Sequence, residues 1–260
     1  MTTEPTKLTV SVNDRDSVTA LLYLAQKKQR AGITLILGHG AGAGQLHPFM
    51  RLFANGLAAR GLDVMTFNFV YMEQGRHVPD PKAKLEACYR TVMAAAQTHK
   101  ALKGNRLAIG GKSMGGRIAS QVAAESTGLT GFTKSDQGKT PSKKRPQATN
   151  KEKGNEIDLA GLVFLGYPLH PPGNPEKLRD AHLNQIKAPM LFIQGSRDAF
   201  GTEDELRAVI KRLHLPATLH PIAGGDHSLK VPKSAGIPQD QVYESTMDEI
   251  ARWLRSEGDE

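Results

Sequence analysis

Short apolar runs and longer amphipathic segments alternate along most of the chain. The run ITLILG at residues 33–38 is apolar throughout, as is typical of a strand buried on both faces of a parallel sheet. The segment at 82–100 is longer and rich in good helix formers. Because strands that alternate with helices favour right-handed crossovers, we predict an α/β fold with a doubly wound, mostly parallel sheet. We predict strands at residues 7–12, 18–24, 33–38, 63–69, 106–110, 159–165, 189–194 and 217–222, and helices at 47–61, 82–100, 114–125, 202–213 and 241–255.

The same pattern predicts how the chain is organised. The first two strands flank the turn sequence NDRD, which indicates an antiparallel pair. Roughly twenty residues separate the strands at 159–165 and 189–194, which is too few for a large cap domain. With 260 residues, an α/β chain can form one core, so we expect residues 1–260 to make a single domain.

Charge is concentrated in one segment. The chain carries a formal net charge of +8, and residues 132–156 hold seven Lys or Arg against three Asp or Glu. This segment has few apolar residues, so we expect a flexible surface insertion. No aromatic residues lie among its cations to stack on bases, which argues against nucleic-acid binding. A tether for a nucleic acid or an acidic partner is the alternative function of this insertion.

The location of the protein is also constrained by composition. The N-terminal residues lack the apolar core of a signal peptide, and no run approaches the roughly 18 apolar residues of a membrane span. The single Cys88 cannot form an internal disulfide, which fits a reducing compartment. We therefore expect a cytoplasmic protein that does not bind membranes.

Two glycine-rich segments suggest nucleotide binding but do not meet its requirements. In LAIGGKSMGGR at 107–117, the Gly-Lys-Ser triplet lacks the first P-loop glycine, because Arg106 occupies that position. The sequence GHGAGA at 38–43 matches the relaxed dinucleotide pattern. The next strand, however, ends in Asn68 and Phe69 and provides no carboxylate for a ribose. We therefore predict no nucleotide cofactor.

Residues 107–117 fit a serine nucleophile elbow instead. Such an elbow needs a strand, a serine on a sharp turn and a helix, with small residues two positions before and after the serine. Ser113 lies between Gly111 and Gly115, after a predicted strand and before a predicted helix. This spacing predicts Ser113 as the nucleophile.

A serine hydroxyl needs a base and an acid to activate it. The strand at 189–194 runs into a loop with Asp198, and the strand at 217–222 runs into a loop with His227. The order Ser113, Asp198, His227 is the one expected for this architecture. Asp226 is the alternative acid, but its adjacency to His227 makes a bond to that ring awkward. For the oxyanion, we predict the backbone N–H groups of Met114 and Ala41.

With these residues identified, the sequence resembles the α/β-hydrolase superfamily, in its small, cap-less, dienelactone-hydrolase-like branch. The stretches FNFVYMEQGRHVPDP (67–81), GGKSMGGR (110–117) and FLGYPLHPPGNPEKLR (164–179) resemble one subfamily, whose animal relatives include a testis-expressed protein and a subunit of a histone-acetyltransferase complex. The resemblance implies Ser113, Asp198 and His227 as the catalytic residues. Some relatives resemble scaffolds, so a non-catalytic adaptor is the alternative function.

The sequence therefore predicts a serine hydrolase of carboxylic esters, thioesters or lactones that acts on a small acyl substrate. Loops bearing His39, Tyr71, Arg76 and Tyr167 are expected to border the pocket, with Arg76 a candidate for binding an anionic group. Lys112 is expected to point from the elbow into solvent. No His and acidic residues have the spacing of metal ligands, so we predict neither a metal nor another cofactor.

Overall fold

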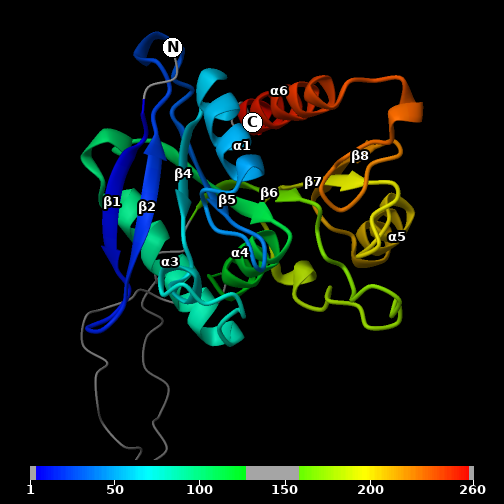
Figure 1. Ribbon diagram of the computed structural model, residues 1–260, viewed down its shortest axis with the longest axis horizontal. Helices are drawn as coiled ribbons and strands as arrows, with labels where there is room; N and C mark the ends of the chain where they lie inside the picture. Colours follow the sequence, from blue (N-terminus) through cyan, green and yellow to red (C-terminus); the bar gives the residue numbers. More distant parts are fainter. Residues whose placement is uncertain (1–3, 127–157, 258–260) are drawn as a thin grey trace, which may run out of the picture.

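The computed structural model describes residues 4–126 and 158–257 (Figure 1). The predicted basic insertion at 132–156 lies outside these residues. Eight strands form one sheet in the order β1-β2-β4-β3-β5-β6-β7-β8. The strands are β1 (Thr6–Ser11), β2 (Ser17–Tyr23), β3 (Ile33–Gly38), β4 (Asp63–Phe67), β5 (Arg106–Lys112), β6 (Leu159–Leu165), β7 (Met190–Gly195) and β8 (Ala217–Ile222).

The pairing of the strands confirms the predicted fold class. β1 and β2 are antiparallel, as is β2 with β4, and every pairing from β4 to β8 is parallel. All residues of β3, β6 and β7 are buried, as expected for strands covered on both faces. The carboxyl ends of the parallel strands therefore meet at one edge of the sheet.

Helices cover both faces of the sheet. One face packs against α1 and α6, whose apolar residues join a core with those of β3 and β7. The other packs against α3, α4 and α5 around a second core. Figure 1 shows α1 and α6 together on one side and α3 and α4 on the other. The helices are α1 (Pro48–Ala59), α2 (Val70–Glu73), α3 (Lys82–Thr98), α4 (Met114–Ser126), α5 (Glu203–Leu213) and α6 (Gln239–Ser256).

The predicted long helices and all eight predicted strands are confirmed, with ends shifted by a few residues. The sequence pattern missed the short helix α2, because four residues are too few to express a helical period. It also missed four single-turn 3₁₀ helices. They are η1 (Lys27–Gln29), η2 (Lys100–Leu102), η3 (Leu183–Gln185) and η4 (Lys233–Ala235). In the described part of the chain, no helix is long and apolar enough to cross a bilayer.

Candidate active site

Ser113 lies on a sharp turn between β5 and α4. Its backbone has a positive φ of 51°, a conformation that a residue with a side chain seldom adopts without a surrounding constraint. Two bonds provide that constraint, because the Ser113 N–H donates to the Leu165 carbonyl at 3.1 Å and the Arg117 N–H donates to the Ser113 carbonyl at 3.0 Å. The turn therefore holds the hydroxyl above the sheet edge.

The glycines beside Ser113 allow a very close approach of β3. A Cβ atom at Gly111 would lie 2.3 Å from the Gly38 carbonyl oxygen, and one at Gly115 would lie 2.1 Å from the same atom. Such distances are below any van der Waals contact, so a side chain at either position would push β3 away. Small residues two before and two after Ser113 are therefore a steric requirement of this turn.

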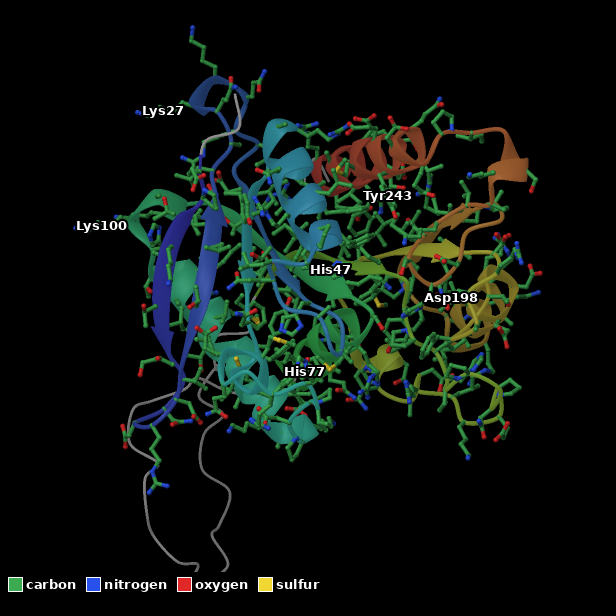
Figure 2. The ribbon with its side chains drawn as sticks, in the orientation of Figure 1. Lys27, His47, His77, Lys100, Asp198 and Tyr243 are labelled. Carbon is green, nitrogen blue, oxygen red and sulfur yellow. The ribbon has the colours of Figure 1, made fainter. Side chains whose placement is uncertain are left out.

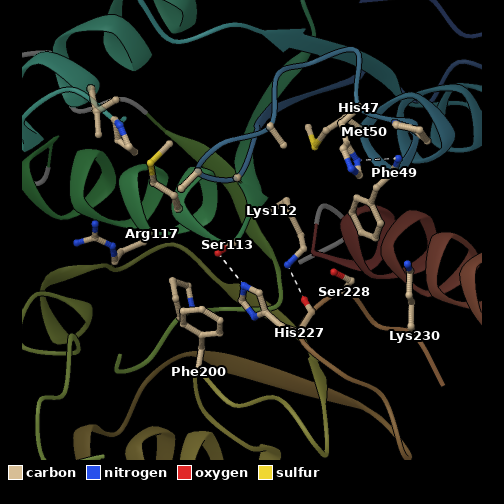
Figure 3. Close-up of a pocket in the computed structure, with 18 of the residues that line it drawn as sticks. His47, Phe49, Met50, Lys112, Ser113, Arg117, Phe200, His227, Ser228 and Lys230 are labelled. Atoms are coloured by element: carbon tan, nitrogen blue, oxygen red, sulfur yellow. Dashed lines mark hydrogen bonds between the residues drawn. The ribbon is translucent and has the colours of Figure 1, made fainter. Parts of the chain in front are cut away.

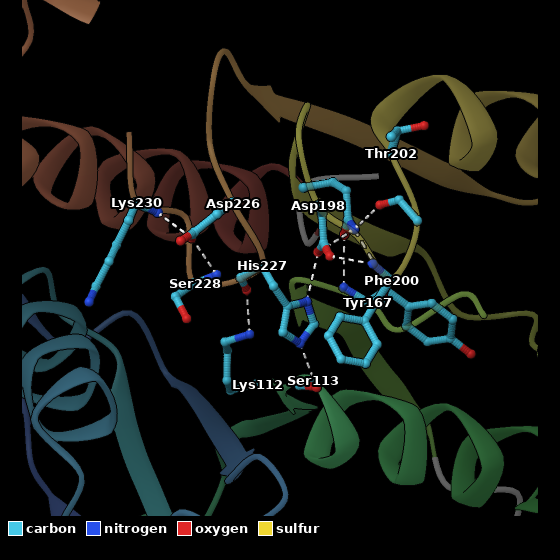
Figure 4. Close-up of polar contacts among 12 residues, drawn as sticks. Lys112, Ser113, Tyr167, Asp198, Phe200, Thr202, Asp226, His227, Ser228 and Lys230 are labelled. Atoms are coloured by element: carbon cyan, nitrogen blue, oxygen red, sulfur yellow. Dashed lines mark hydrogen bonds and ion pairs between the residues drawn. The ribbon is translucent and has the colours of Figure 1, made fainter. Parts of the chain in front are cut away.

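The structure brings Ser113, Asp198 and His227 into one hydrogen-bonded chain (Figure 4). The Asp198 Oδ2 and the His227 Nδ1 are 2.8 Å apart, and the His227 Nε2 and the Ser113 Oγ are also 2.8 Å apart. Because the Asp198 carboxylate only accepts, Nδ1 carries the proton and donates it, and Nε2 is free to accept from the serine hydroxyl. The imidazole is thus oriented for removing a proton from Ser113.

Asp198 is held by a buried network that sequence analysis missed. The side chain amide of Gln194 donates to Asp198 Oδ2 at 2.9 Å, and the Phe200 N–H donates to Oδ1 at 2.8 Å. The Gln194 amide also donates to the Gly201 carbonyl, and its oxygen accepts from the Tyr167 N–H. Gln194 is a polar residue at the end of an otherwise apolar strand, and this was the signal available in the sequence.

Two further residues contact His227. The ring of Phe200 packs on the imidazole, with centroids 4.2 Å apart and planes inclined by 33°. The Lys112 Nζ donates to the His227 carbonyl oxygen at 2.5 Å, so the expectation that Lys112 points into solvent is wrong. Burial lowers the pKa of Lys112 to about 8, against the attraction of Asp198 and Asp226. Lys112 therefore ties the turn of Ser113 to the loop of His227.

Asp226 accepts hydrogen bonds from the backbone of its own loop. Its Oδ1 accepts from the N–H groups of Ser228 at 2.7 Å and Lys230 at 2.9 Å. These bonds close the turn that carries His227, and the ring of His227 is bonded to Asp198 instead. The preference for Asp198 over Asp226 as the partner of the imidazole agrees with this geometry.

Ser113 opens into a cavity of about 1080 Å³ (Figure 3). His47, Phe49 and Met50, from the start of α1, lie on one side of Ser113, and Arg117 lies on the other. Both predicted oxyanion residues, Ala41 and Met114, line the cavity beside the serine. The cavity is lined by Gly40, Ala41, Ala43, His47, Pro48, Phe49, Met50, Leu52, Pro79, Asp80, Lys82, Leu85, Lys112, Ser113, Met114, Arg117, Pro168, Arg179, Phe200, His227, Ser228, Lys230 and Tyr243.

The four residues predicted to border the pocket are absent from this lining. His39 is fully buried, where its Nδ1 donates to the Gly40 carbonyl at 2.8 Å and its Nε2 accepts from the Phe69 N–H at 3.1 Å. Burial lowers its pKa to about 4, so the ring stays neutral and supports the loop next to Ser113. His39 therefore orders the site without facing a ligand.

Tyr71, Tyr167 and Arg76 were misplaced for different reasons. Helix α2 turns the Tyr71 ring into the core, where it is fully buried. Tyr167 is also fully buried, and its hydroxyl donates to the Arg179 carbonyl at 3.2 Å. Arg76, which is exposed, donates to the Oδ1 of the buried Asp80 at 2.7 Å. His77, on the same loop, lies on the side of the molecule opposite Tyr243 of α6 (Figure 2).

In the described ranges, no three His, Cys, Asp or Glu side chains converge to hold a metal ion. The polar contacts around Ser113 join its hydroxyl to an imidazole and that imidazole to a carboxylate.

Comparisons with known proteins agree with the observed fold. Residues 31–255 match a family described as an alpha/beta hydrolase domain. The fold is similar to a dienelactone hydrolase from Anabaena variabilis, with a TM-score of 0.66 and 18% identity over 97% of this chain and 98% of that chain. It is also similar to a serine hydrolase without a lid from Xanthomonas campestris (TM-score 0.63, 15% identity, 99% and 94% covered). A third similar structure is an esterase from Pyrococcus furiosus (TM-score 0.65, 14% identity, 97% and 91% covered). Since the family match spans most of its length, the chain belongs to the alpha/beta hydrolase domain family.

Proposed function

We propose that the protein is a serine hydrolase that cleaves carboxylic esters, thioesters or lactones through an acyl-enzyme. The observation that carries this proposal is the pair of 2.8 Å hydrogen bonds that joins Asp198 to His227 and His227 to Ser113. A serine in this arrangement can lose its proton to the imidazole while its oxygen attacks a carbonyl carbon.

The proposed reaction has two halves. In the first, the Ser113 Oγ bonds to the carbonyl carbon as its proton moves to His227 Nε2. The bond to the leaving group then breaks, and His227 returns the proton to that group. In the second half a water molecule repeats the attack on the acyl-enzyme with His227 as base, which releases the acid and restores Ser113. Asp198 keeps the proton on Nδ1 and stabilises the imidazolium that forms in each half.

The backbone N–H groups of Ala41 and Met114 are the proposed donors to the oxyanion. Both residues line the cavity with Ser113, and the loop of Ala41 lies close to the serine, since a Cβ atom at Gly40 would be 3.7 Å from the Ser113 Cβ. One such donor is worth about 3 kcal/mol in the transition state of other hydrolases. His39 supports this arrangement because it bonds the Gly40 carbonyl.

The cavity supports a small-molecule substrate. Phe49, Met50 and Leu52 provide an apolar side that suits an acyl or alcohol chain. The similar proteins include an esterase and a dienelactone hydrolase, which favours ester and lactone chemistry over a purely structural role.

The test uses Ser113→Ala and p-nitrophenyl esters of graded acyl length. We expect the wild-type protein to hydrolyse these esters and the variant to lose about three orders of magnitude or more in kcat with unchanged thermal unfolding. A fluorophosphonate probe should label wild-type protein and Ser228→Ala, a serine beside the base, but not Ser113→Ala. A folded wild-type protein that neither reacts with the probe nor cleaves any ester would favour the non-catalytic adaptor.

A further inference from the structure

Two arginines, Arg117 and Arg179, line the cavity. Arg117 lies on α4, one helical turn after Ser113, and Arg179 lies in the loop between β6 and β7. The Tyr167 hydroxyl donates to the Arg179 carbonyl. Burial raises the pKa of Tyr167 to about 12, and the charges of Arg117 and Arg179 oppose this rise. Figure 3 shows Arg117 across Ser113 from His47 and Phe49. The two side chains thus place positive charge at one end of the proposed substrate cavity.

Neither guanidinium group contacts a carboxylate within residues 4–126 and 158–257. No ion pair joins Arg117 or Arg179 to a carboxylate in those ranges, and the Arg117 Nε is buried with no hydrogen-bond partner there. Burial lowers the pKa of Arg117 and the charge of Arg179 lowers it further, against the smaller opposing effects of Tyr167 and Glu86. A buried donor and a pair of neighbouring cations are both costly unless an acceptor of negative charge is present.

Other partly buried arginines of the protein do pair with carboxylates. Arg30 donates to Asp63 at 2.5 Å, Arg60 donates to Glu244 at 2.6 Å, and Arg90 pairs with Glu125. These partly buried arginines therefore have carboxylate partners from the protein itself. Arg117 and Arg179 lack such a carboxylate partner among the described residues, so their guanidinium groups can pair with a bound anion.

The other charged residues that line this side of the cavity form ion pairs with residues other than Arg117 and Arg179. Asp80 also lines the cavity, but its Oδ1 accepts from Arg76 at 2.7 Å. Lys82 lines the cavity as well and pairs with Glu86 at 3.3 Å. Burial, followed by the charges of Lys82 and Arg117, lowers the pKa of His182 to about 4 against the attraction of Asp180. Arg76, the anion-binding candidate from the sequence, is already engaged with Asp80.

We propose that Arg117 and Arg179 together bind a carboxylate of the substrate, at a position remote from the carbonyl that Ser113 attacks. Paired guanidinium groups present several N–H donors in fixed planes, which match the two oxygens of a carboxylate. This inference rests on the proposed hydrolase and narrows its substrates to esters, thioesters or lactones that carry an acid group. The apolar side of the cavity then holds the uncharged part of the substrate.

The experiment compares substrates that differ only in this charge. The first pair is the mono-p-nitrophenyl ester of adipic acid and its methyl-capped counterpart, which place the carboxylate on the acyl group. The second pair is the butyrate ester of 4-hydroxyphenylacetic acid and its methyl-capped counterpart, which place it on the leaving group. For at least one pair we expect the wild-type protein to have a kcat/KM about tenfold or more higher for the acid, mostly through a lower KM.

Single substitutions locate the effect. Arg117→Gln and Arg179→Gln should each reduce the acid-to-neutral ratio of kcat/KM about tenfold, whereas Arg117→Lys, which keeps the charge but not the planar fork, should reduce it less. Lys230→Gln is the matched control, because it removes one positive charge from the other side of the same cavity. Equal losses of the ratio in Lys230→Gln and Arg117→Gln would indicate general attraction and overturn a specific site.

Binding measured without turnover separates this inference from the proposed function. Adipate should bind Ser113→Ala protein in calorimetry, and adding Arg117→Gln or Arg179→Gln should weaken this binding about tenfold. If neutral esters are hydrolysed but neither acid is preferred and adipate does not bind, the arginine site is refuted while the hydrolase stands. If adipate binds through the arginines but no ester is cleaved and no probe reacts, the site stands and the hydrolase is refuted.

Discussion

Replacing Lys112 with Met should change the pH dependence of stability in a defined direction. The Lys112 ammonium donates to the His227 carbonyl, yet burial lowers its pKa from 10.5 to about 8. In the unfolded chain the same group keeps an ordinary pKa. Between about pH 8 and 10.5 the unfolded state therefore binds the proton that the folded state has released, so this group makes the protein more stable as the pH rises.

The size of the effect follows from the shift. Each pKa unit corresponds to about 1.4 kcal/mol, so the charged form of Lys112 costs about 3 kcal/mol of folding free energy at neutral pH. Lys112→Met removes this cost and also loses a hydrogen bond worth about 1 kcal/mol. We therefore expect the variant to be about 2 kcal/mol more stable than wild type at pH 7 and about 1 kcal/mol less stable above pH 10.5.

Urea unfolding of both proteins between pH 7 and 10.5 measures this difference. Burial also raises the pKa of Cys88 to about 12, and its unfolded thiolate lowers stability above pH 9. Cys88 is present in both proteins, so its contribution cancels when the two free energies are subtracted. A difference that stays constant over the range, or a variant that is already less stable at pH 7, would refute the argument. We expect the variant to lose activity nevertheless, because the loop of His227 is no longer tied to the elbow.

Two further predictions concern buried groups near the sheet. Gln194→Met should lower kcat and also lower the free energy of unfolding by about 1–3 kcal/mol, because it leaves Asp198, the Gly201 carbonyl and the Tyr167 N–H without their shared partner. Steady-state kinetics measures the first effect and urea titration the second. An unchanged kcat would contradict a role for this network in orienting Asp198. Cys88 is fully buried and its pKa is raised, so it should react with a thiol reagent only as fast as the protein unfolds locally or globally. Rapid labelling of the native protein at pH 8 would contradict the burial of Cys88.

The part of the site that sequence could predict depends on strand ends. Ser113, Asp198 and His227 lie just beyond the carboxyl ends of three parallel strands, and the sheet brings those ends to one edge. The glycines around Ser113 were also informative, because their spacing reflects local steric limits. Such features are encoded within a few residues, so they can be recognised before any long-range packing is known.

The direction of side chains after the strand ends could not be predicted in the same way. Tyr71 and Tyr167 both follow strands and both turn into the core, since each aromatic ring finds an apolar neighbour there. Lys112 turns toward a carbonyl that is 115 positions later in the chain. These orientations depend on contacts between distant segments, about which the local pattern carries no information.

Lys112 and Arg117 share one physical feature that connects stability with the proposed chemistry. Each is a cation whose pKa is lowered chiefly by burial, and each lies within four residues of Ser113. Both charges therefore reduce the stability of the empty protein. Negative charge introduced into the cavity would offset this cost, as an anionic substrate group would at Arg117. Because a ligand that binds only the folded state raises its stability, adipate should raise the melting temperature of the wild-type protein and do so less for Arg117→Gln. An equal rise in the melting temperatures of the wild type and Arg117→Gln would mean that adipate does not bind to the guanidinium of Arg117.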